Sequence, residues 1–274
     1  MNCFICPICG ARLSKSDKSY ICQSRHCFDI AREGYVNLLS AGKANSAVPG
    51  DNKDMVNART RFLESGGYAV FADKIADIVS HLSSKKAPII LDAGCGQGYY
   101  DRKIKDKLPE SELFGIDISK FAVKYASSHN KDISYAVAGV YDMPIADGCA
   151  DILLSVFSPL APQEFARVAA DEAALVIAVP GPRHLFGLKE ILYREPYENE
   201  IISTEYEGFE FAERVPIKAS LSLEGNELIT ALFAMTPYYW KTGTDGHERL
   251  KNTAALETEI EFDILVYRRI KHNK

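Results

Sequence analysis

Several features that mark membrane-spanning, secreted and strongly basic proteins are missing from this sequence. It has no run of 18 apolar residues, which excludes a transmembrane helix. The first residues lack the basic region and apolar stretch of a secretory signal, so we expect a cytoplasmic protein without a membrane partner. The formal net charge is -5 at pH 7, so the composition as a whole does not predict a nucleic-acid-binding protein.

The remaining composition is typical of a soluble globular protein. The chain has 274 residues, 47% hydrophobic and 25% charged, which is enough for one large core and a small appendage. Residues 1–60 carry a net charge of +3 and the remainder -8, which permits a local basic face toward RNA. In a cytoplasmic protein, the seven cysteines are expected to be metal ligands or free thiols and not disulfides.

Two cysteine-containing turns near the N-terminus have the spacing of a metal site. Cys-x-x-Cys, twelve intervening residues and Cys-x-x-x-His supply four candidate ligands: Cys6, Cys9, Cys22 and His26. A sulfur-rich set of four favours zinc in a closed tetrahedral site, and the role is then structural because no coordination position is left open. So short a segment has too little apolar content to fold alone, so the metal would stabilise it. Cys3 and Cys27 flank this set, and the spacing leaves open whether either joins it.

A glycine-rich turn, Asp92 to Gly98, follows an apolar run that predicts a buried strand. Its three glycines stand at alternate positions, where they let the backbone approach a ligand closely. A dinucleotide fingerprint would place its third glycine at position 99, where this chain has tyrosine, and Asp92 would repel a pyrophosphate. Asp117 ends the next strand, 19 residues past Gly98, in the usual place for a carboxylate that binds ribose hydroxyls. The two acids predict a binding site for S-adenosylmethionine. The alternatives are a dinucleotide-binding site and a glycine-rich turn that binds no ligand.

Strand and helix patterns alternate from residue 88 onward. The predicted strands are 88–93, 112–117, 133–138, 151–156 and 173–179, and the predicted helices are 99–108, 119–128 and 164–168. This alternation predicts an α/β fold with a doubly wound, mostly parallel sheet like that of class I S-adenosylmethionine-dependent methyltransferases. Ligands of such sheets bind at the carboxyl ends of the strands.

The ends of the chain have a different character. Helical spacing over 55–63 and 71–82 predicts two helices before the first strand, with Tyr68 between them. Alternating patterns predict antiparallel strands at 217–223, 227–235 and 257–267, and Pro216 suits the opening position of the first. The chain therefore divides into a zinc-binding domain (1–37), a linker (38–54) and a methyltransferase domain (55–274); the family resemblance given next implies RNA recognition by the first.

Taken together, these motifs resemble the 23S rRNA guanine-N1 methyltransferases of the RlmA (RrmA) type, nearly from end to end. The most specific parts are the cysteine-histidine head with its Glu33-Gly-Tyr-Val-Asn-Leu38 tail, and the block Pro180-Gly-Pro-Arg-His184. Pro49-Gly-Asp51, Ala58-Arg59 with Phe62-Leu63, and Met235-Thr-Pro237 also match. The glycine loop alone would indicate only a methyltransferase.

The resemblance implies a zinc-containing head that helps to hold an RNA hairpin, and a homodimer whose shared cleft takes the RNA. It maps the metal ligands to Cys6, Cys9, Cys22 and His26, and it places Tyr68, Gly96, Gln97 and His184 near the cofactor. Combined with the loop analysis, the predicted S-adenosylmethionine-binding residues are Tyr68, Asp92, Gly94, Gly96, Gln97, Gly98, Asp117, Ile118, Tyr141, Asp142 and His184.

The expected reaction is methylation of N1 of a guanine in a hairpin loop of 23S rRNA, by in-line attack on the sulfonium methyl group. Alignment is expected to dominate catalysis, and the N1 proton needs an acceptor. Asp142, Ser155 and His184 are candidates for catalytic roles, and none stands out as a base. The alternatives are a small-molecule methyltransferase and a non-catalytic adaptor that binds S-adenosylmethionine and RNA. Removal of zinc is expected to abolish RNA binding and to leave cofactor binding.

Overall fold

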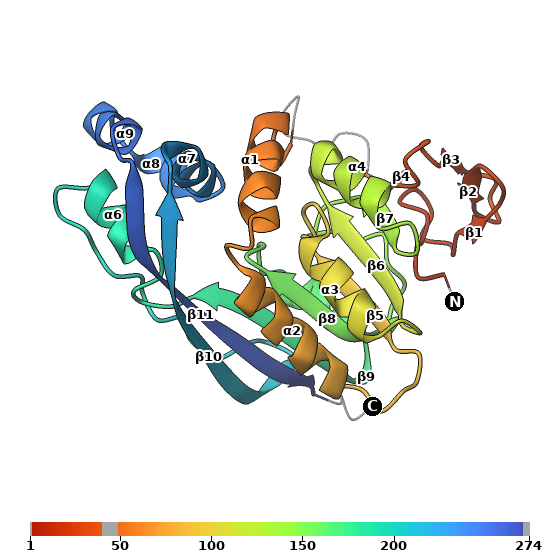
Figure 1. Cartoon of the computed structure of the whole chain (residues 1–274). Helices are drawn as coiled ribbons and strands as arrows, with labels where there is room; N and C mark the ends of the chain where they lie inside the picture. Colours follow the sequence, from red (N-terminus) through yellow and green to blue (C-terminus); the bar gives the residue numbers. More distant parts are fainter. Residues whose placement is uncertain (1, 40–48, 271–274) are drawn as a thin grey trace.

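The computed structural model describes residues 2–39 and 49–270, and its central element is an eight-stranded sheet (Figure 1). In spatial order the strands are β10 (Phe209–Glu224), β11 (Ala255–Arg269), β9 (Ala169–Pro180), β8 (Ala150–Val156), β5 (Ile89–Ala93), β6 (Glu112–Asp117), β7 (Ser134–Val137) and β4 (Val36–Asn37). All neighbours from β9 to β4 are parallel, and β11 is antiparallel to both of its neighbours. The predicted doubly wound, mostly parallel sheet is therefore confirmed.

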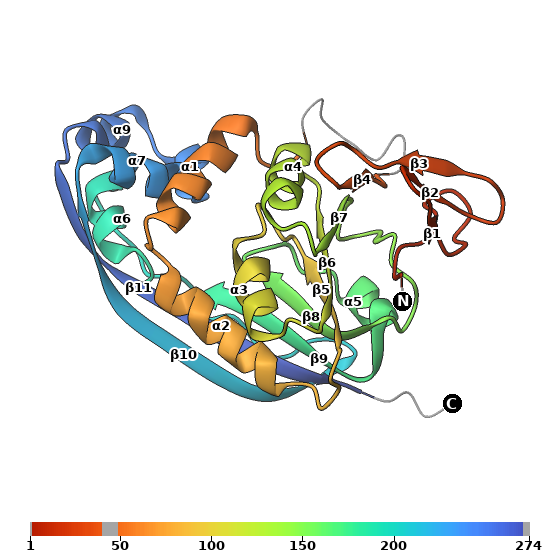
Figure 2. The same ribbon diagram turned by 45° about the vertical axis from the view of Figure 1, so that its right-hand side comes forward.

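Helices cover one face of this sheet almost completely. Apolar residues of α1 (Lys53–Glu64), α2 (Ala69–His81), α3 (Tyr99–Lys107) and α4 (Lys120–His129) share one buried cluster with the strands. The side chain of Asn52 caps α1 by accepting from the backbone N–H groups of Asp54 and Met55, and Ser119 caps α4 in the same way. In both views α1 stands between α4 and the C-terminal helices (Figures 1 and 2).

The opposite face is covered in part by the N-terminal head, residues 2–37. The head contains a small antiparallel sheet of β1 (Ser14–Lys15), β2 (Ser19–Ile21) and β3 (Cys27–Asp29), and its last strand, β4, extends the main sheet beside β7. Phe4 is fully buried, with its ring 5.3 Å from that of Phe114 on β6. The apolar residues of the head share one buried cluster with the strands and with α5 (Pro162–Val168). The head is thus part of the core of the large domain.

The cysteine prediction is wrong for two of the seven residues, because Cys3 and Cys149 form a disulfide with Cα atoms 6.0 Å apart. The N-terminal segment runs against the loop that follows β7: Phe4 bridges to Ile145, and the backbone N–H of Ala146 donates to the carbonyl of Cys3 at 2.8 Å. This long-range contact, across 146 residues, brings the two thiols together.

Helices gather beside one end of β10 and β11, at the left of Figure 1: α6 (Phe186–Leu192), α7 (Asn226–Ala234), α8 (Tyr238–Lys241) and α9 (Thr244–Lys251). The predicted strand 227–235 is wrong, because this segment is α7, which buries Ile229, Leu232 and Phe233 at helical spacing. Pro216 lies within β10 and does not open it; it is tolerated there because β10 is an edge strand.

The other predicted elements agree with the structure to within a few residues, except that β9 and β10 begin earlier than predicted. Residues 40–48, most of the predicted linker, lie outside the described residues. Within the described ranges, none of the helices has the length and apolar character needed to cross a membrane.

Candidate functional site

The glycine loop connects the buried end of β5 to the start of α3. Gly94, Gly96 and Gly98 have φ angles of +99°, +53° and +73°, a backbone region that favours glycine. The backbone N–H groups of Gly94 and Cys95 donate to the carbonyl of Ile116 at 2.8 and 3.0 Å, which ties the loop to β6. The loop therefore lies at the carboxyl ends of two adjacent parallel strands, as the sequence predicts.

The three glycines have different surroundings. A Cβ at Gly94 would lie 2.3 Å from Cβ of Ser158, and a Cβ at Gly98 would lie 2.5 Å from the hydroxyl of Tyr135. These two glycines are required by packing within the protein. Within the described part of the chain, a Cβ at Gly96 would meet only Nη1 of Arg59, at 3.9 Å. Gly96 is therefore the loop position that leaves space for a ligand.

Two residues of the loop have buried polar atoms without hydrogen-bond partners among the described residues. Asp92 is 1% exposed and Gln97 is 5% exposed, and among the described residues neither Oδ1 of Asp92 nor Nε2 of Gln97 has a hydrogen-bond partner. An unsatisfied buried polar group costs about 1–3 kcal/mol, so a ligand that paired with these atoms would be favoured here. A cofactor with both donors and acceptors at its methionine end fits these residues.

The electrostatics of the loop favour a cation beside Asp92. Burial, followed by the charges of Asp101 and Asp117, raises the pKa of Asp92 well above its usual range. Burial also raises the pKa of Asp101 to about 6, although the hydroxyl of Tyr135 donates to its Oδ2 at 2.9 Å. An ammonium group would relieve this cost by stabilising the ionised form of Asp92.

Asp117 ends β6 beside the loop, as predicted. Its Oδ2 accepts from the backbone N–H of Gly96 at 3.0 Å and its Oδ1 from that of Ser119 at 2.7 Å. Burial is the main cause that raises the pKa of this carboxyl group. Ile118 follows, and its Cγ2 would lie 2.8 Å from a Cβ at Gly50, so the segment before α1 packs over this corner.

The fold brings Tyr68 and His184 together although 116 residues separate them. The hydroxyl of Tyr68 lies 3.3 Å from Nε2 of His184, and the backbone N–H of Glu261 donates to Nδ1 at 3.4 Å. Burial, assisted by the charge of Lys189, lowers the pKa of His184 to about 3. The imidazole is therefore neutral near pH 7, with its proton on Nε2, and it orients Tyr68 more readily than it accepts a proton.

Ser155, the second catalytic candidate, has a structural contact. Its Oγ lies 2.9 Å from Oγ of Ser158, which in turn donates to the carbonyl of Ala93. These contacts tie the end of β8 to the end of β5. Between the two serines, Phe157 has a φ of +56° and is 44% exposed. A bulky residue in this conformation is strained, and such strain is concentrated at functional sites.

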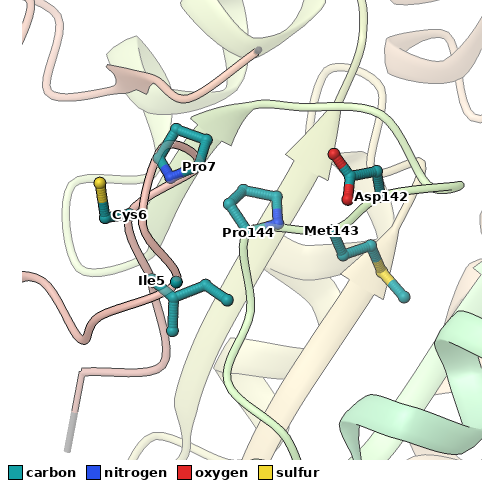
Figure 3. A pocket seen from close by; sticks show the side chains of 7 residues that line it. Ile5, Cys6, Pro7, Asp142, Met143 and Pro144 are labelled. Atoms are coloured by element: carbon teal, nitrogen blue, oxygen red, sulfur yellow. The ribbon is translucent and has the colours of Figure 1, made fainter.

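Tyr141 and Asp142 lie in the loop that contacts the head. Asp142 lines a small pocket of about 150 Å³ opposite Ile5, Cys6 and Pro7 (Figure 3). The next residue, Met143, donates its backbone N–H to Oε2 of Glu164 on α5 at 2.7 Å. Tyr141 is 70% exposed. The described contacts of this segment therefore connect it to the head and to α5, which share the core cluster on the sheet face opposite α1 to α4.

The four predicted metal ligands converge in the head, where all their ligand atoms lie within 4.8 Å of one another. The sulfurs of Cys9 and Cys22 are 3.7 Å apart, and Nδ1 of His26 lies 3.4 Å from the sulfurs of Cys6 and Cys22. With Zn–S near 2.3 Å and Zn–N near 2.0 Å, a tetrahedron has edges of about 3.8 Å (S–S) and about 3.5 Å (S–N). The donor set and its geometry thus fit zinc.

The two flanking cysteines fall outside this cluster. Cys3 is in the disulfide, and Cys27 is an exposed residue of β3. The sequence does not mark Arg59 as a site residue, although Ala58-Arg59 belongs to a motif that matches the family. Helical spacing alone could not show that this side chain reaches Gly96.

Comparison with solved structures supports the fold. The YcgJ protein of Bacillus subtilis matches with a TM-score of 0.51 at 12% identity, over 72% of this chain and 98% of that one. The [4+2]-cyclase SpnF also matches with a TM-score of 0.51, at 15% identity, over 83% of this chain and 100% of that one. A methyltransferase domain profile matches residues 90–178, and the profile described as "RlmA, N-terminal", a zinc ribbon, matches residues 4–47. The chain is thus a zinc-ribbon protein with an S-adenosylmethionine-dependent methyltransferase fold.

Curated relatives define the family more closely. A 23S rRNA (guanine(748)-N(1))-methyltransferase of Streptomyces fradiae is 32% identical over 246 residues, covering 88% of this chain and 86% of the relative. A Bacillus subtilis (strain 168) protein, provisionally named a 23S rRNA (guanine-N(1)-)-methyltransferase, is 32% identical over 274 residues, covering 96% of both chains. The chain belongs to the family of 23S rRNA (guanine-N1)-methyltransferases.

Proposed function

We propose that this protein transfers the methyl group of S-adenosylmethionine to N1 of a guanine in 23S rRNA. The observation that carries the proposal is the open space at Gly96, bordered by unpartnered buried atoms of Asp92 and Gln97, in a chain with a family-type zinc ribbon. The names of the relatives support the choice of acceptor.

Each predicted cofactor residue near the loop has a role in this proposal. Asp92 would face the methionine ammonium, and Asp117 would accept the ribose hydroxyls in place of part of its present backbone contacts. Gly96 and Gln97 would contribute backbone and amide donors beside them. Tyr68, oriented by His184 through its hydroxyl, would contact the same region. The cofactor supplies an electrophilic methyl group, so the protein has to align the acceptor with it.

The proton on guanine N1 needs an acceptor, and the three candidates differ. The low pKa of His184 makes it a weak base, and the hydroxyl of Ser155 contacts Ser158. Asp142 is exposed and lines a pocket against the head, so it does not stand out as a base either. Cys6, Cys9, Cys22 and His26 would hold zinc in a structural role.

The finer parts of the proposal come from the family resemblance. They are a guanine in a hairpin loop as the target, RNA contact by the head, a homodimer, and a cytoplasmic location. An unpaired loop base is easier to extrude than one in a duplex, which suits a hairpin target. Exposed side chains on the head, Ile8 and Arg32 among them, are available for such a contact.

The test is incubation of the purified protein with methyl-labelled S-adenosylmethionine and 23S rRNA that has not been modified at this site. We expect label in the rRNA and a reverse-transcription stop at one guanine, because a methyl group on N1 blocks base pairing. The Asp117→Ala variant is the negative control and should transfer no methyl group to the rRNA. Label only in a small-molecule fraction would favour the small-molecule methyltransferase, and cofactor and RNA binding without transfer would favour the adaptor.

A further inference from the structure

Arg59 places a cationic group at the mouth of an otherwise acidic site. Among the residues that the structure describes, its Nη1 is the only heavy atom outside the neighbouring residues within 4 Å of the Cβ position at Gly96. The charged groups that raise the pKa of Asp92 are both acidic, Asp101 and Asp117. The guanidinium of Arg59 acts in the opposite direction on Asp117, whose pKa it lowers. Arg59 therefore offsets part of the negative charge around the loop.

The methionine end of S-adenosylmethionine carries both an ammonium and a carboxylate. Asp92 suits the ammonium, but the acids Asp92, Asp101 and Asp117 would repel the carboxylate unless a cation stood beside it. Arginine is well matched to a carboxylate, because its planar guanidinium can donate two parallel hydrogen bonds. We propose that Arg59 binds the methionine carboxylate of S-adenosylmethionine at Gly96 and thereby determines selectivity for the complete amino-acid end of the cofactor.

The surroundings of Arg59 hold its guanidinium at this position. Nη1 forms an ion pair with Oδ2 of Asp51, and the carbonyl of Asp51 accepts from Oγ of Ser119 at 2.6 Å. Ser119 follows Asp117 by two residues, so this chain of contacts anchors Arg59 to the turn after β6. The side chain of Arg59 is 26% exposed and that of Asp51 20%, so the pair is neither fully solvated nor closed off. Asp51 engages one side of the guanidinium and leaves further N–H groups for a ligand.

Two other roles would use the same residue differently. Arg59 could serve only to hold α1 against the segment before it, through Asp51. It could also contact an RNA phosphate, since arginine serves that purpose widely. A comparison of S-adenosylmethionine with its decarboxylated form distinguishes these roles from the proposed one. Only a residue that binds the methionine carboxylate would make the protein prefer the complete cofactor.

The inference rests on the proposed cofactor, and its test needs no RNA and no turnover. Calorimetry would measure the affinity of the full-length, zinc-containing protein for S-adenosylmethionine and for decarboxylated S-adenosylmethionine, which keeps the amine and the sulfonium. The wild-type protein should prefer the complete cofactor by at least about 10-fold, as expected for a hydrogen bond to a charged group. Arg59→Gln should lose most of that preference by weakening binding of S-adenosylmethionine alone, and Arg59→Lys should keep part of it.

Arg61→Gln is the matched control, because Arg61 lies on the same helix and pairs with Glu227 on α7 at 2.7 Å. It should leave both affinities within about 2-fold. Equal weakening of both ligands by Arg59→Gln would overturn the inference in favour of a structural role. Unchanged affinities of Arg59→Gln for both ligands would also overturn it, and a separate RNA-binding measurement on that variant would then test the phosphate contact. If the wild-type protein bound neither S-adenosylmethionine nor its decarboxylated form, both the inference and the proposed function would be wrong. That result differs from a loss of selectivity, which would concern the inference alone.

Discussion

The cysteine-histidine cluster and the glycine loop are two candidate ligand sites, and they are built in opposite ways. In the cluster, four side chains converge on one another to within a few ångströms and leave no open coordination position. In the loop, side chains fill the space beside Gly94 and Gly98, and the space at Gly96 is left open next to unpartnered polar atoms. A closed set of ligands suits a permanent structural ion, and an open, unsatisfied site suits a ligand that exchanges at each turnover.

The two sites also differ in which face of the sheet they support. The head belongs to the cluster of buried residues that includes Phe114 and Phe165, whereas α1 to α4 pack in the other cluster. From the sequence, zinc removal is expected to abolish RNA binding and to leave cofactor binding unchanged. The structure argues against that separation, because Phe4 and β4 of the head complete the core and the sheet of the large domain.

The largest expected effect is that of losing a metal ligand. Cys22→Ser, or removal of zinc by a chelator, should destabilise the whole chain by at least about 5 kcal/mol, because zinc-binding free energy is also folding free energy. Thermal denaturation followed by circular dichroism would show the main sheet unfolding at a lower temperature. Cys27→Ser, which changes an exposed cysteine of the same head, is the control and should have no effect. An unchanged unfolding temperature of the main sheet would contradict the shared core.

The glycines of the loop should separate stability from cofactor binding. Gly98→Ala should cost about 2–4 kcal/mol, because it adds a clash with Tyr135 to the strain of a positive φ. Gly96→Ala should cost only about 1 kcal/mol and should weaken binding of S-adenosylmethionine by at least about 10-fold. Denaturant unfolding and cofactor titration would measure the two effects. Similar behaviour of both variants would contradict the different surroundings of the two glycines.

A smaller effect is expected from pH. The pKa of Asp101 is about 6 in the folded protein and about 3.9 in an unfolded chain, so the folded state binds the proton more tightly. Stability of the cofactor-free protein should therefore fall as pH rises from about 4 to about 6, by at most about 3 kcal/mol from this group. Asp101→Asn keeps an acceptor for the hydroxyl of Tyr135 and should reduce this slope, measured by denaturant unfolding at each pH. A slope that is unchanged in the variant would argue against Asp101 as its source.

The smallest effect is expected at Ser155. Ser155→Ala removes the contact with Ser158 and should cost about 1 kcal/mol of stability, with kcat within about 3-fold of the wild-type value. Methyl transfer at saturating cofactor and RNA would measure this. A loss of kcat of about 100-fold or more, without a comparable loss of stability, would restore Ser155 as a catalytic residue.

Local patterns were sufficient to predict the parallel strands and the metal ligands. Buried parallel strands have continuous apolar runs, and the four ligands occupy two short turns whose spacing is itself the signal. The same local patterns misled at α7, where Ile229, Leu232 and Phe233 are apolar in both a strand and a helix pattern, and tertiary packing decides between them.

Contacts between distant segments were beyond the reach of the sequence. The Cys3–Cys149 disulfide spans 146 residues, and Tyr68 meets His184 across 116 residues. Arg59 was part of a recognised motif, but its place at Gly96 depends on how α1 lies over the loop. Neither spacing nor composition contains that geometry, so these contacts could be seen only in the folded structure.

The central claim is that the open site delivers a methyl group to one atom of one base. Nucleoside analysis by mass spectrometry, after incubation of 23S rRNA with the protein and S-adenosylmethionine, tests it most directly. The account predicts a gain of N1-methylguanosine with the wild-type protein and none with Asp117→Ala. A gain of a different methylated nucleoside, or no change in the RNA while S-adenosylmethionine is bound, would contradict it.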